Sequence, residues 1–195
     1  MTTLVIGAGP AGLAAVKSLK EADLPVKCVE KNGDVGGQWL YGAAPSAVYA
    51  STHLISSKRT TAYADFPMPE DWPAYPSHER VSEYFKSFAK HFDLYPLIRF
   101  NTEVTKLEQR DGSWRATLGD GTTEDYESVI FANGHLSDPL MPKIPGEFSG
   151  KLMHAKDYKT ADIFEGKRVL VVGMGNTGCD IVVDAIHRAK EVLWS

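Results

Sequence analysis

A glycine-rich turn near the N-terminus constrains this chain more than any other feature. The segment Gly7-Ala8-Gly9-Pro10-Ala11-Gly12 follows a short apolar run, Thr3 to Ile6, and opens a stretch of helical character from Pro10 to Ala22. A second apolar run, Val26 to Glu30, ends in an acid. Strand, glycine turn, helix and strand together predict a βαβ unit of the kind that binds a dinucleotide.

The residue types in this turn suit a pyrophosphate. Gly7 permits the tight turn, Gly9 lets a pyrophosphate approach the backbone, and Gly12 lets helix and strand pack closely. The helix N-terminus adds partial positive charge. Glu30 stands where an acid accepts hydrogen bonds from a ribose 2′-hydroxyl, and it would repel a 2′-phosphate, so the site favours FAD or NAD over NADP. The alternative is a glycine turn needed only for packing.

The same pattern returns near the other end of the sequence. The segment Gly173-Met174-Gly175-Asn176-Thr177-Gly178 lies between an apolar run, Arg168 to Val172, and a helical stretch, Thr177 to Ala189, followed by a strand-like run, Val192 to Trp194. Two such units predict two dinucleotide sites, or one site duplicated and degenerate. Enzymes in which a nicotinamide cofactor reduces a flavin need two, because hydride passes between the bound dinucleotides.

A long loop follows the first unit. Residues 31–77 are rich in Gly, Pro, Ser and aromatic residues, and a loop of this length inside a globular chain is usually functional. Within it, Gly36-Gly37-Gln38-Trp39 stands close to Glu30, which favours a second contact with the same cofactor over a plain turn with a buried tryptophan. Ser77 is a plausible cap for the next helix. Its apolar side chains recur at helical spacing and predict a core face: Val81, Tyr84, Phe85, Phe88 and Phe92.

Strand-like runs dominate the middle of the chain. Three runs from Arg99 to Phe131 are separated by the turns Asp111-Gly112 and Asp120-Gly121, which predicts a β-meander. Val129 to Ala132 should end the meander by returning to the main sheet.

Composition and charge exclude several classes of protein. The 195 residues carry a formal net charge of −4, which does not favour a nucleic-acid partner. No apolar run approaches the roughly 20 residues that span a bilayer, and the first residues lack the basic start of a secretion signal, so we expect a cytoplasmic protein without a membrane partner. Cys28 and Cys179 match neither a redox pair nor a metal site, and we expect two buried thiols.

The segment between the two glycine motifs points to a family. Residues 148–158, FSGKLMHAKDY, fit the pattern FxGxxxHxxxY through Phe148, Gly150, His154 and Tyr158. With tyrosine last, the chain resembles the flavin-containing monooxygenases, whereas tryptophan is favoured there in Baeyer–Villiger monooxygenases. Further segments resemble the family's stretch that lines flavin and nicotinamide, and its strand-end turn near the FAD. These are Tyr49 to Ser51, Ser56 to Lys58, Asp65 to Pro67, and Phe131 to His135.

The resemblance implies an enzyme that uses FAD, NADPH, O2 and a small-molecule substrate. In that family NADPH reduces FAD, O2 adds at flavin C4a, and retained NADP⁺ shields the resulting hydroperoxide until a soft nucleophilic N or S centre takes the distal oxygen. The protein orients the reactants and excludes water, while the cofactor carries out the chemistry. No metal or catalytic triad is therefore expected. His154 is interpreted as a structural or hinge residue.

The implied cofactor contacts follow the motifs. The candidate FAD contacts are Gly7, Gly9, Pro10, Ala11, Gly12, Glu30, Gly37, Gln38, Trp39, Ser56 and Val104. The candidate NADP contacts are Gly173, Gly175, Asn176, Thr177, Gly178 and Ser195.

The predicted fold class is α/β. It consists of a doubly wound, Rossmann-type FAD-binding domain with a β-meander, followed by the start of a second Rossmann-type domain that binds NADP. Residues 1–145 are expected to form the FAD-binding domain without its C-terminal completion, residues 146–166 the linker and signature segment, and residues 167–195 the beginning of the NAD(P)-binding domain. Family members are considerably longer, so we expect a fragment that is inactive alone; an oligomer is possible.

One residue departs from the family pattern. Ile55, beside Ser56 and near the flavin by resemblance, stands where the family usually has an asparagine that contacts the nicotinamide cofactor. Isoleucine neither donates nor accepts a hydrogen bond. The alternatives to a coupled monooxygenase are therefore an uncoupled flavin-dependent NAD(P)H oxidase, a Baeyer–Villiger-type enzyme or a non-catalytic dinucleotide-binding module. A flavin disulfide reductase would need a redox cysteine pair, which the sequence lacks.

Overall fold

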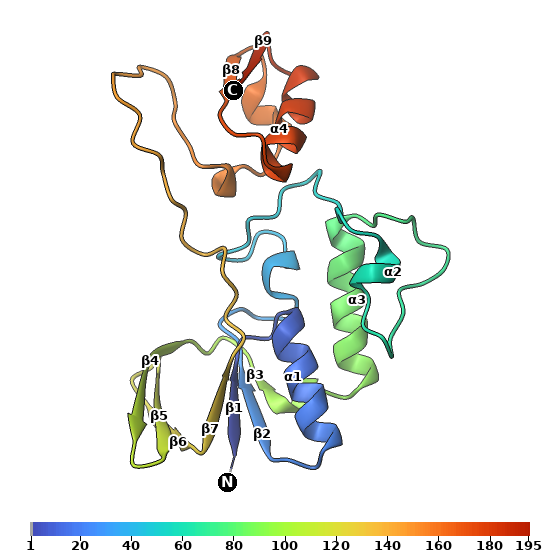
Figure 1. The fold of residues 1–195 in the computed structure, drawn as a ribbon, viewed down its shortest axis with the longest axis vertical. Helices are drawn as coiled ribbons and strands as arrows, with labels where there is room; N and C mark the ends of the chain where they lie inside the picture. The colour runs from blue at the N-terminus through green and yellow to red at the C-terminus, as the bar shows by residue number, and fades with distance from the viewer. Residues whose placement is uncertain (1) are drawn as a thin grey trace.

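A four-stranded parallel sheet organises the first part of the chain (Figure 1). The computed structural model describes residues 2–195. The strand order is β3-β2-β1-β7, and α1 (Pro10–Glu21) joins the two central strands. Ile6 lies opposite both Val29 and Phe131, which confirms the first βαβ unit and the predicted return of the chain after the meander. The strands are β1 (Thr3–Ile6), β2 (Val26–Val29), β3 (Ile98–Arg99) and β7 (Ser128–Phe131).

Alternate residues of each strand face opposite sides of this sheet. Val5 and Cys28 point towards α1 and α3 (His78–His91), and together with the aromatic face of α3 they form the main core. The predicted helix after Ser77 and its apolar face are confirmed: Tyr84 and Phe88 are almost fully buried, and η2 (Tyr95–Leu97) then leads into β3.

The meander covers the other side of the sheet. It is antiparallel, and its residues Ala116 and Tyr126 pack on Leu4 and Val29. Both Asp-Gly turns lie where the sequence predicts them, and their glycines have positive φ angles. Arg99 also donates to Glu124 over 2.7 Å across this interface. The meander strands are β4 (Val104–Arg110), β5 (Ser113–Leu118) and β6 (Thr123–Tyr126).

The long loop after β2 is largely irregular, as predicted. It contains the 3-10 turn η1 (Gly37–Trp39) and the single helical turn α2 (Lys58–Thr61). The ammonium of Lys58 donates to the carbonyl oxygens of Pro69, Glu70 and Trp72 over 2.6–2.8 Å. This side chain therefore holds the far half of the loop in place.

A second, smaller βαβ unit lies at the other end of the molecule (Figure 1). The chain reaches it through an extended arm whose residues 138–152 are all exposed, and then through the short turns η3 (Ala155–Asp157) and η4 (Ala161–Phe164). The unit consists of the parallel strands β8 (Arg168–Val171) and β9 (Glu191–Trp194), joined by α4 (Asn176–Ile186). This confirms the strand, turn, helix and strand predicted around the second glycine motif.

The expectation of two buried thiols is wrong for one of them. Cys28 is buried, and desolvation raises the pKa of its thiol to about 12. Cys179 is exposed because the buried side of α4 is formed by Ile181 and Ala185, and position 179 lies on the opposite side of the helix. In residues 2–195, no helix combines the length and the apolar character that a bilayer crossing requires.

Candidate dinucleotide sites

The first glycine turn leaves no room for side chains at its first and third glycines. Gly7 has a φ of +102°, and a Cβ built on it would stand 2.5 Å from the carbonyl oxygen of Ala132. A Cβ on Gly12 would stand 1.8 Å from the carbonyl oxygen of Gly7. Helix α1 therefore approaches β1 as closely as backbone allows, as the sequence predicts for the third glycine.

The second glycine turn repeats this geometry. Gly173 has a φ of +116°, and a Cβ on Gly178 would stand 2.2 Å from the carbonyl oxygen of Gly173. The middle glycines match as well: Gly9 and Gly175 are the N-caps of their helices and have nearly identical extended dihedral angles. Apart from its two chain neighbours, no residue of 2–195 comes within 4 Å of a Cβ built on Gly175, so the space in front of this turn is open.

The amide of each first glycine identifies equivalent positions in the two units. Gly7 N donates to the carbonyl oxygen of Val29 over 2.8 Å, and Gly173 N donates to that of Ser195 over 2.7 Å. Ser195 therefore occupies the place of Val29, one residue before the place of Glu30.

Glu30 lies at the end of β2 against the first turn and is only 4% exposed. Its Oε2 accepts from the amide of Ala8 over 2.7 Å, and its Oε1 accepts from the backbone and side-chain nitrogens of Asn32, both over 2.9 Å. A carboxylate offers about four acceptor sites, so one remains for a ligand hydroxyl. The position fits the ribose-binding role predicted for this acid.

The third predicted motif packs directly on the first. Gly36 N donates to the carbonyl oxygen of Ala8 over 3.0 Å, and a Cβ on Gly37 would stand 2.9 Å from the Cα of Gly9. Gln38 accepts from the amide of Ala47 through Oε1, and Trp39 lies half-buried against the main core. The structure thus brings together Gly9, Gly37 and Glu30 at the carboxyl end of the parallel strands, where α/β sheets bind ligands.

Three other candidate residues lie apart from this turn. Ile55 is 70% exposed, Ser56 shares a hydrogen bond with Thr61 over 2.7 Å, and Val104, the first residue of β4, packs with Leu4 between the meander and the parallel sheet. Within residues 2–195, none of the three candidates hydrogen-bonds to the first glycine turn. Their contacts with a cofactor stay predictions.

The signature segment is structural in large part. The ring of Phe148 covers Gly150, where a Cβ would stand 2.7 Å from ring carbons. His154 accepts the amide of Lys156 through Nδ1 over 3.1 Å and so caps η3, which supports its interpretation as a structural residue. Tyr158 is buried in the second unit, and its hydroxyl donates to Asp184 Oδ2 over 2.6 Å.

Comparison with known proteins decides the family. The sequence model of one protein family, described as flavin-binding monooxygenase-like, matches residues 2–195 of this chain. This chain belongs to the flavin-binding monooxygenase-like family. Flavin-containing monooxygenase 3 of Macaca mulatta is 38% identical to it over 98% of this chain and 39% of the relative. The chain thus spans about two fifths of the length of the curated relatives that it matches.

Solved structures of similar proteins have this fold. The S-allyl-L-cysteine S-oxygenase from Allium sativum has a TM-score of 0.91 at 25% identity, over 99% of this chain and 50% of that chain. A structure of OTEMO in complex with FAD and NADP has a TM-score of 0.79 at 29% identity, over 100% of this chain and 38% of that chain. The α/β fold with its parallel sheet and antiparallel meander is therefore a fold of this family.

Sequence reasoning missed two acids in this family member. Asp180 and Asp184 lie one turn apart on α4 and accept hydrogen bonds from Tyr49, Ser51 and Tyr158. By resemblance, Tyr49 to Ser51 are expected only as part of a cofactor-lining stretch. The available signal was the spacing of two acids by four residues on a helix that is otherwise mostly apolar.

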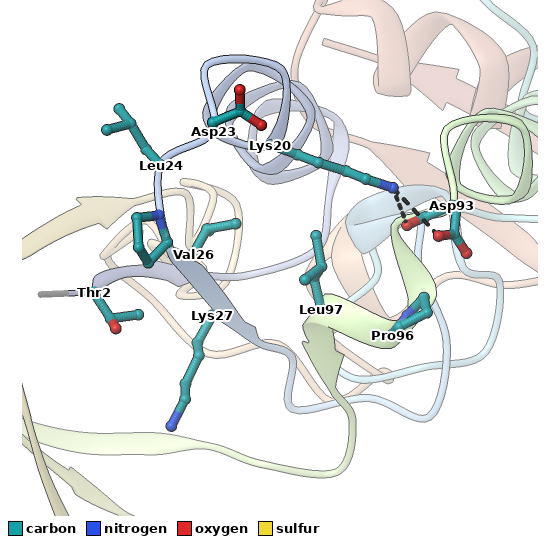
Figure 2. Close-up of a pocket in the computed structure, with 10 residues that line it drawn as sticks. Thr2, Lys20, Asp23, Leu24, Val26, Lys27, Asp93, Pro96 and Leu97 are labelled. Carbon is teal, nitrogen blue, oxygen red and sulfur yellow. Dashed lines mark hydrogen bonds and ion pairs between the residues drawn. The ribbon is translucent and has the colours of Figure 1, made fainter.

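A surface groove of about 430 Å³ lies at the opposite end of the parallel sheet (Figure 2). Thr2 and Val26 line it at the starts of β1 and β2. The ammonium of Lys20 donates there to the carbonyl and carboxylate oxygens of Asp93. Because ligands of this fold bind at the carboxyl ends of the strands, this groove is separate from the candidate dinucleotide sites.

Proposed function

We propose that FAD binds at the first glycine turn and NADPH at the second. The observation that carries this proposal is the repetition of one backbone geometry at two turns of one chain, from Gly7 to Gly12 and from Gly173 to Gly178. Family membership supports it, as does the solved complex of OTEMO with FAD and NADP.

The residues at the first turn suit FAD. Gly9 and Gly37 pack on each other through bare backbone beside the proposed pyrophosphate path, the amino end of α1 adds partial positive charge, and Glu30 keeps one acceptor site for the adenosine ribose. Pro10 and Ala11 begin α1, and Gln38 and Trp39 border the same turn, so we propose all of these as the FAD contacts, with Ser56 and Val104 as outlying ones.

The residues at the second turn suit a nicotinamide dinucleotide. Gly175 stands in front of open space, and Asn176 and Thr177 begin the helix whose amino end faces that space. Ser195 lies beside Gly173 at the end of the adjoining strand. We propose residues 1–145 as the FAD-binding domain, 146–166 as the linker with the signature, and 167–195 as the beginning of the NAD(P)-binding domain.

The full-length protein is, in this proposal, a monooxygenase of soft nucleophilic N or S centres in small molecules. Bound FAD would supply the redox chemistry, namely acceptance of hydride and activation of O2. The residues of this chain bind and orient the two cofactors. The S-oxygenase of Allium sativum, named for the substrate S-allyl-L-cysteine, supports a thioether as one substrate class.

The experiment compares products. Full-length protein loaded with FAD is supplied with NADPH, O2 and one of three probes: N,N-dimethylaniline, S-allyl-L-cysteine or a cyclic ketone. N-oxide or sulfoxide formation in step with NADPH consumption supports the proposal. A lactone from the ketone alone would indicate a Baeyer–Villiger enzyme, and absence of any NADPH consumption would refute enzymatic function.

A second candidate function rests on Ile55. Its exposed apolar side chain stands where the family's asparagine is expected, and a protein that consumes NADPH but releases hydrogen peroxide without oxygenating any probe would be an NAD(P)H oxidase. Parallel assays with NADH establish which nicotinamide the second turn accepts.

A further inference from the structure

The two acids of α4 are held by hydroxyl groups from distant parts of the chain. Tyr49 donates to Asp180 Oδ2 over 2.6 Å. Tyr158 and Ser51 both donate to Asp184 Oδ2, over 2.6 and 2.5 Å. Since α4 begins at the second glycine turn, the bonds from Tyr49 and Ser51 fasten this helix to the loop after η1, and the bond from Tyr158 fastens it to the signature segment.

This contact is built as a packed core. Tyr49 and Tyr158 are 5% and 2% exposed, and their ring centroids lie 5.3 Å apart. Burial, followed by Asp180, raises the pKa of the Tyr49 phenol, whereas the Thr177 hydroxyl in the second glycine turn lowers it. Burial, followed by Asp184, raises the pKa of the Tyr158 phenol. Both phenols therefore stay protonated donors at neutral pH.

The same loop is fastened to the first glycine turn. Ser46 donates through Oγ to the carbonyl oxygen of Gln38 over 2.6 Å, and Ala47 N donates to Gln38 Oε1 over 2.9 Å. Gln38 follows Gly37, whose backbone lies on Gly9. A continuous set of contacts therefore runs from the first turn through residues 46–51 to α4.

A partly buried lysine closes this connection. Lys159 Nζ donates to the carbonyl oxygens of Ser46 and Val48 over 2.8 and 3.1 Å, and its own carbonyl oxygen accepts the amide of Ala50 over 2.9 Å. The pKa of the Lys159 ammonium is lowered, chiefly by desolvation. The loop is thus held on both sides of Tyr49.

We propose that Tyr49 is a positioning residue for hydride transfer between the two dinucleotides, because its bond to Asp180 fixes the direction of α4 relative to the first glycine turn. The inference rests on the proposed function. The step concerned moves one hydride, that is, one proton with two electrons, so that the nicotinamide is oxidised and the flavin reduced. Transfer needs the reacting atoms about 3–3.5 Å apart, and a misplacement of about 1 Å can cost roughly 100-fold in rate.

The geometry separates positioning from mere attachment. Removal of the Tyr49 hydroxyl leaves both bonds to Asp184, so α4 stays attached there while it loses its anchor at Asp180, one turn nearer to its amino end. The ring of Tyr49 keeps its packing on Tyr158. A change of cofactor alignment without loss of fold is therefore expected.

The test uses full-length protein loaded with FAD and the variant Tyr49→Phe. Anaerobic stopped-flow reduction by varied NADPH should show a limiting rate at least tenfold lower, with the apparent Kd for NADPH and the FAD content changed less than twofold. Reduction by dithionite should be unchanged. The long-wavelength charge-transfer absorbance of reduced FAD with bound NADP⁺ reports ring overlap directly, and it should weaken in the variant.

Three further variants control this result. Tyr126→Phe removes a matched phenol-to-carboxylate bond, that to Glu124 over 2.5 Å in the meander, and should reduce like the wild type. Asp180→Asn keeps an acceptor oxygen and should stay within about threefold of the wild type, whereas Asp180→Ala should match Tyr49→Phe. The double variant of Tyr49→Phe and Asp180→Ala should be no slower than either single one, because both remove the same bond.

The outcomes are distinct. An unchanged limiting rate and charge-transfer band in Tyr49→Phe would overturn the inference. So would a loss accompanied by release of FAD, or by weaker amide-exchange protection throughout residues 2–195 in the cofactor-free protein, because Tyr49 would then serve stability alone. A wild-type protein whose FAD is reduced by neither NADPH nor NADH would instead refute the proposed function.

Discussion

The backbone of Gly37 lies directly against that of Gly9: a Cβ on Gly37 would stand 2.9 Å from the Gly9 Cα. Gly37 also has a φ of +56°, in the left-handed region. The wall of the first turn is therefore formed by a second segment that itself carries no side chain at the point of contact. The proposed pyrophosphate site depends on both segments.

Gly37→Ala should weaken FAD binding at least tenfold, because the new Cβ pushes the Gly9 backbone out of place. Gly42→Ala is the matched control: Gly42 lies in the same loop with a φ of +79°, but no atom stands within 4 Å of its Cβ position. Both variants carry the left-handed strain of about 1–2 kcal/mol. Fluorescence titration of the full-length apoprotein with FAD measures the difference, and equal losses would show that the Gly9 contact is unimportant.

Glu30→Ala should weaken FAD retention by roughly 1–3 kcal/mol, the scale of a hydrogen bond to a charged group together with the donors left unpaired. The amides of Ala8 and Asn32 lose their acceptor as well. Glu30→Gln keeps one acceptor oxygen and should lose less. Equilibrium dialysis against FAD ranks the variants. Native full-length protein with Glu30 intact that bound no flavin would contradict the assignment of the first turn.

Gly175→Val should abolish reduction by NADPH while leaving bound FAD reducible by dithionite. The position faces open space, so the valine fits the fold but fills the proposed path of the phosphate. Gly178→Ala differs, because its Cβ would stand 2.2 Å from the Gly173 carbonyl oxygen and should lower the melting temperature. If Gly175→Val lost both kinds of reduction together, the second turn would be structural only.

Ile55→Asn should lower the hydrogen peroxide released per NADPH consumed. Asparagine supplies the donor and acceptor that isoleucine lacks. Because the position is exposed, the substitution removes little buried apolar surface. Each 1.4 kcal/mol of added protection slows unproductive decay about tenfold. Ile55→Val is the apolar control. A coupled peroxidase assay measures the peroxide yield. Equal yields in the wild type, Ile55→Asn and Ile55→Val would mean that other residues supply the contact with the nicotinamide cofactor.

Glu124→Gln should change stability in a pH-dependent way. The hydrogen bond from Arg99, followed by that from Tyr126, lowers the pKa of the Glu124 carboxyl below its usual 4.5. A lowered folded-state pKa means that the stabilisation is present above pH 4.5 and is lost as the pH falls through the lowered value. The group is partly exposed, so the loss at neutral pH should stay under about 1 kcal/mol. Urea unfolding is measured from pH 7 downward, with Glu103→Gln as the control variant. The difference in unfolding free energy between the wild type and Glu124→Gln should shrink as the pH falls. A difference that stays constant would exclude ionisation of Glu124 as its cause.

Local sterics explain what the sequence could predict. A first glycine with positive φ and a third glycine facing a carbonyl oxygen are requirements of the turn itself, so spacing alone identifies both βαβ units, and the Asp-Gly turns likewise identify the meander. The contact of Tyr49 with Asp180 joins residues distant in sequence, and no local pattern encodes it. The burial expected for Cys179 was wrong for a related reason, since the side of a helix that is covered depends on its tertiary partners.

The contrast between Gly12 and Gly175 also bears on how such proteins diverge. Any side chain at Gly12 collides with the Gly7 carbonyl oxygen, so a substitution there requires the backbone of the turn to move. At Gly175 a side chain displaces no protein atom in residues 2–195. One substitution there can block the proposed nicotinamide site while the flavin-binding fold stays intact. A descendant could therefore lose reduction by NADPH long before it lost its fold.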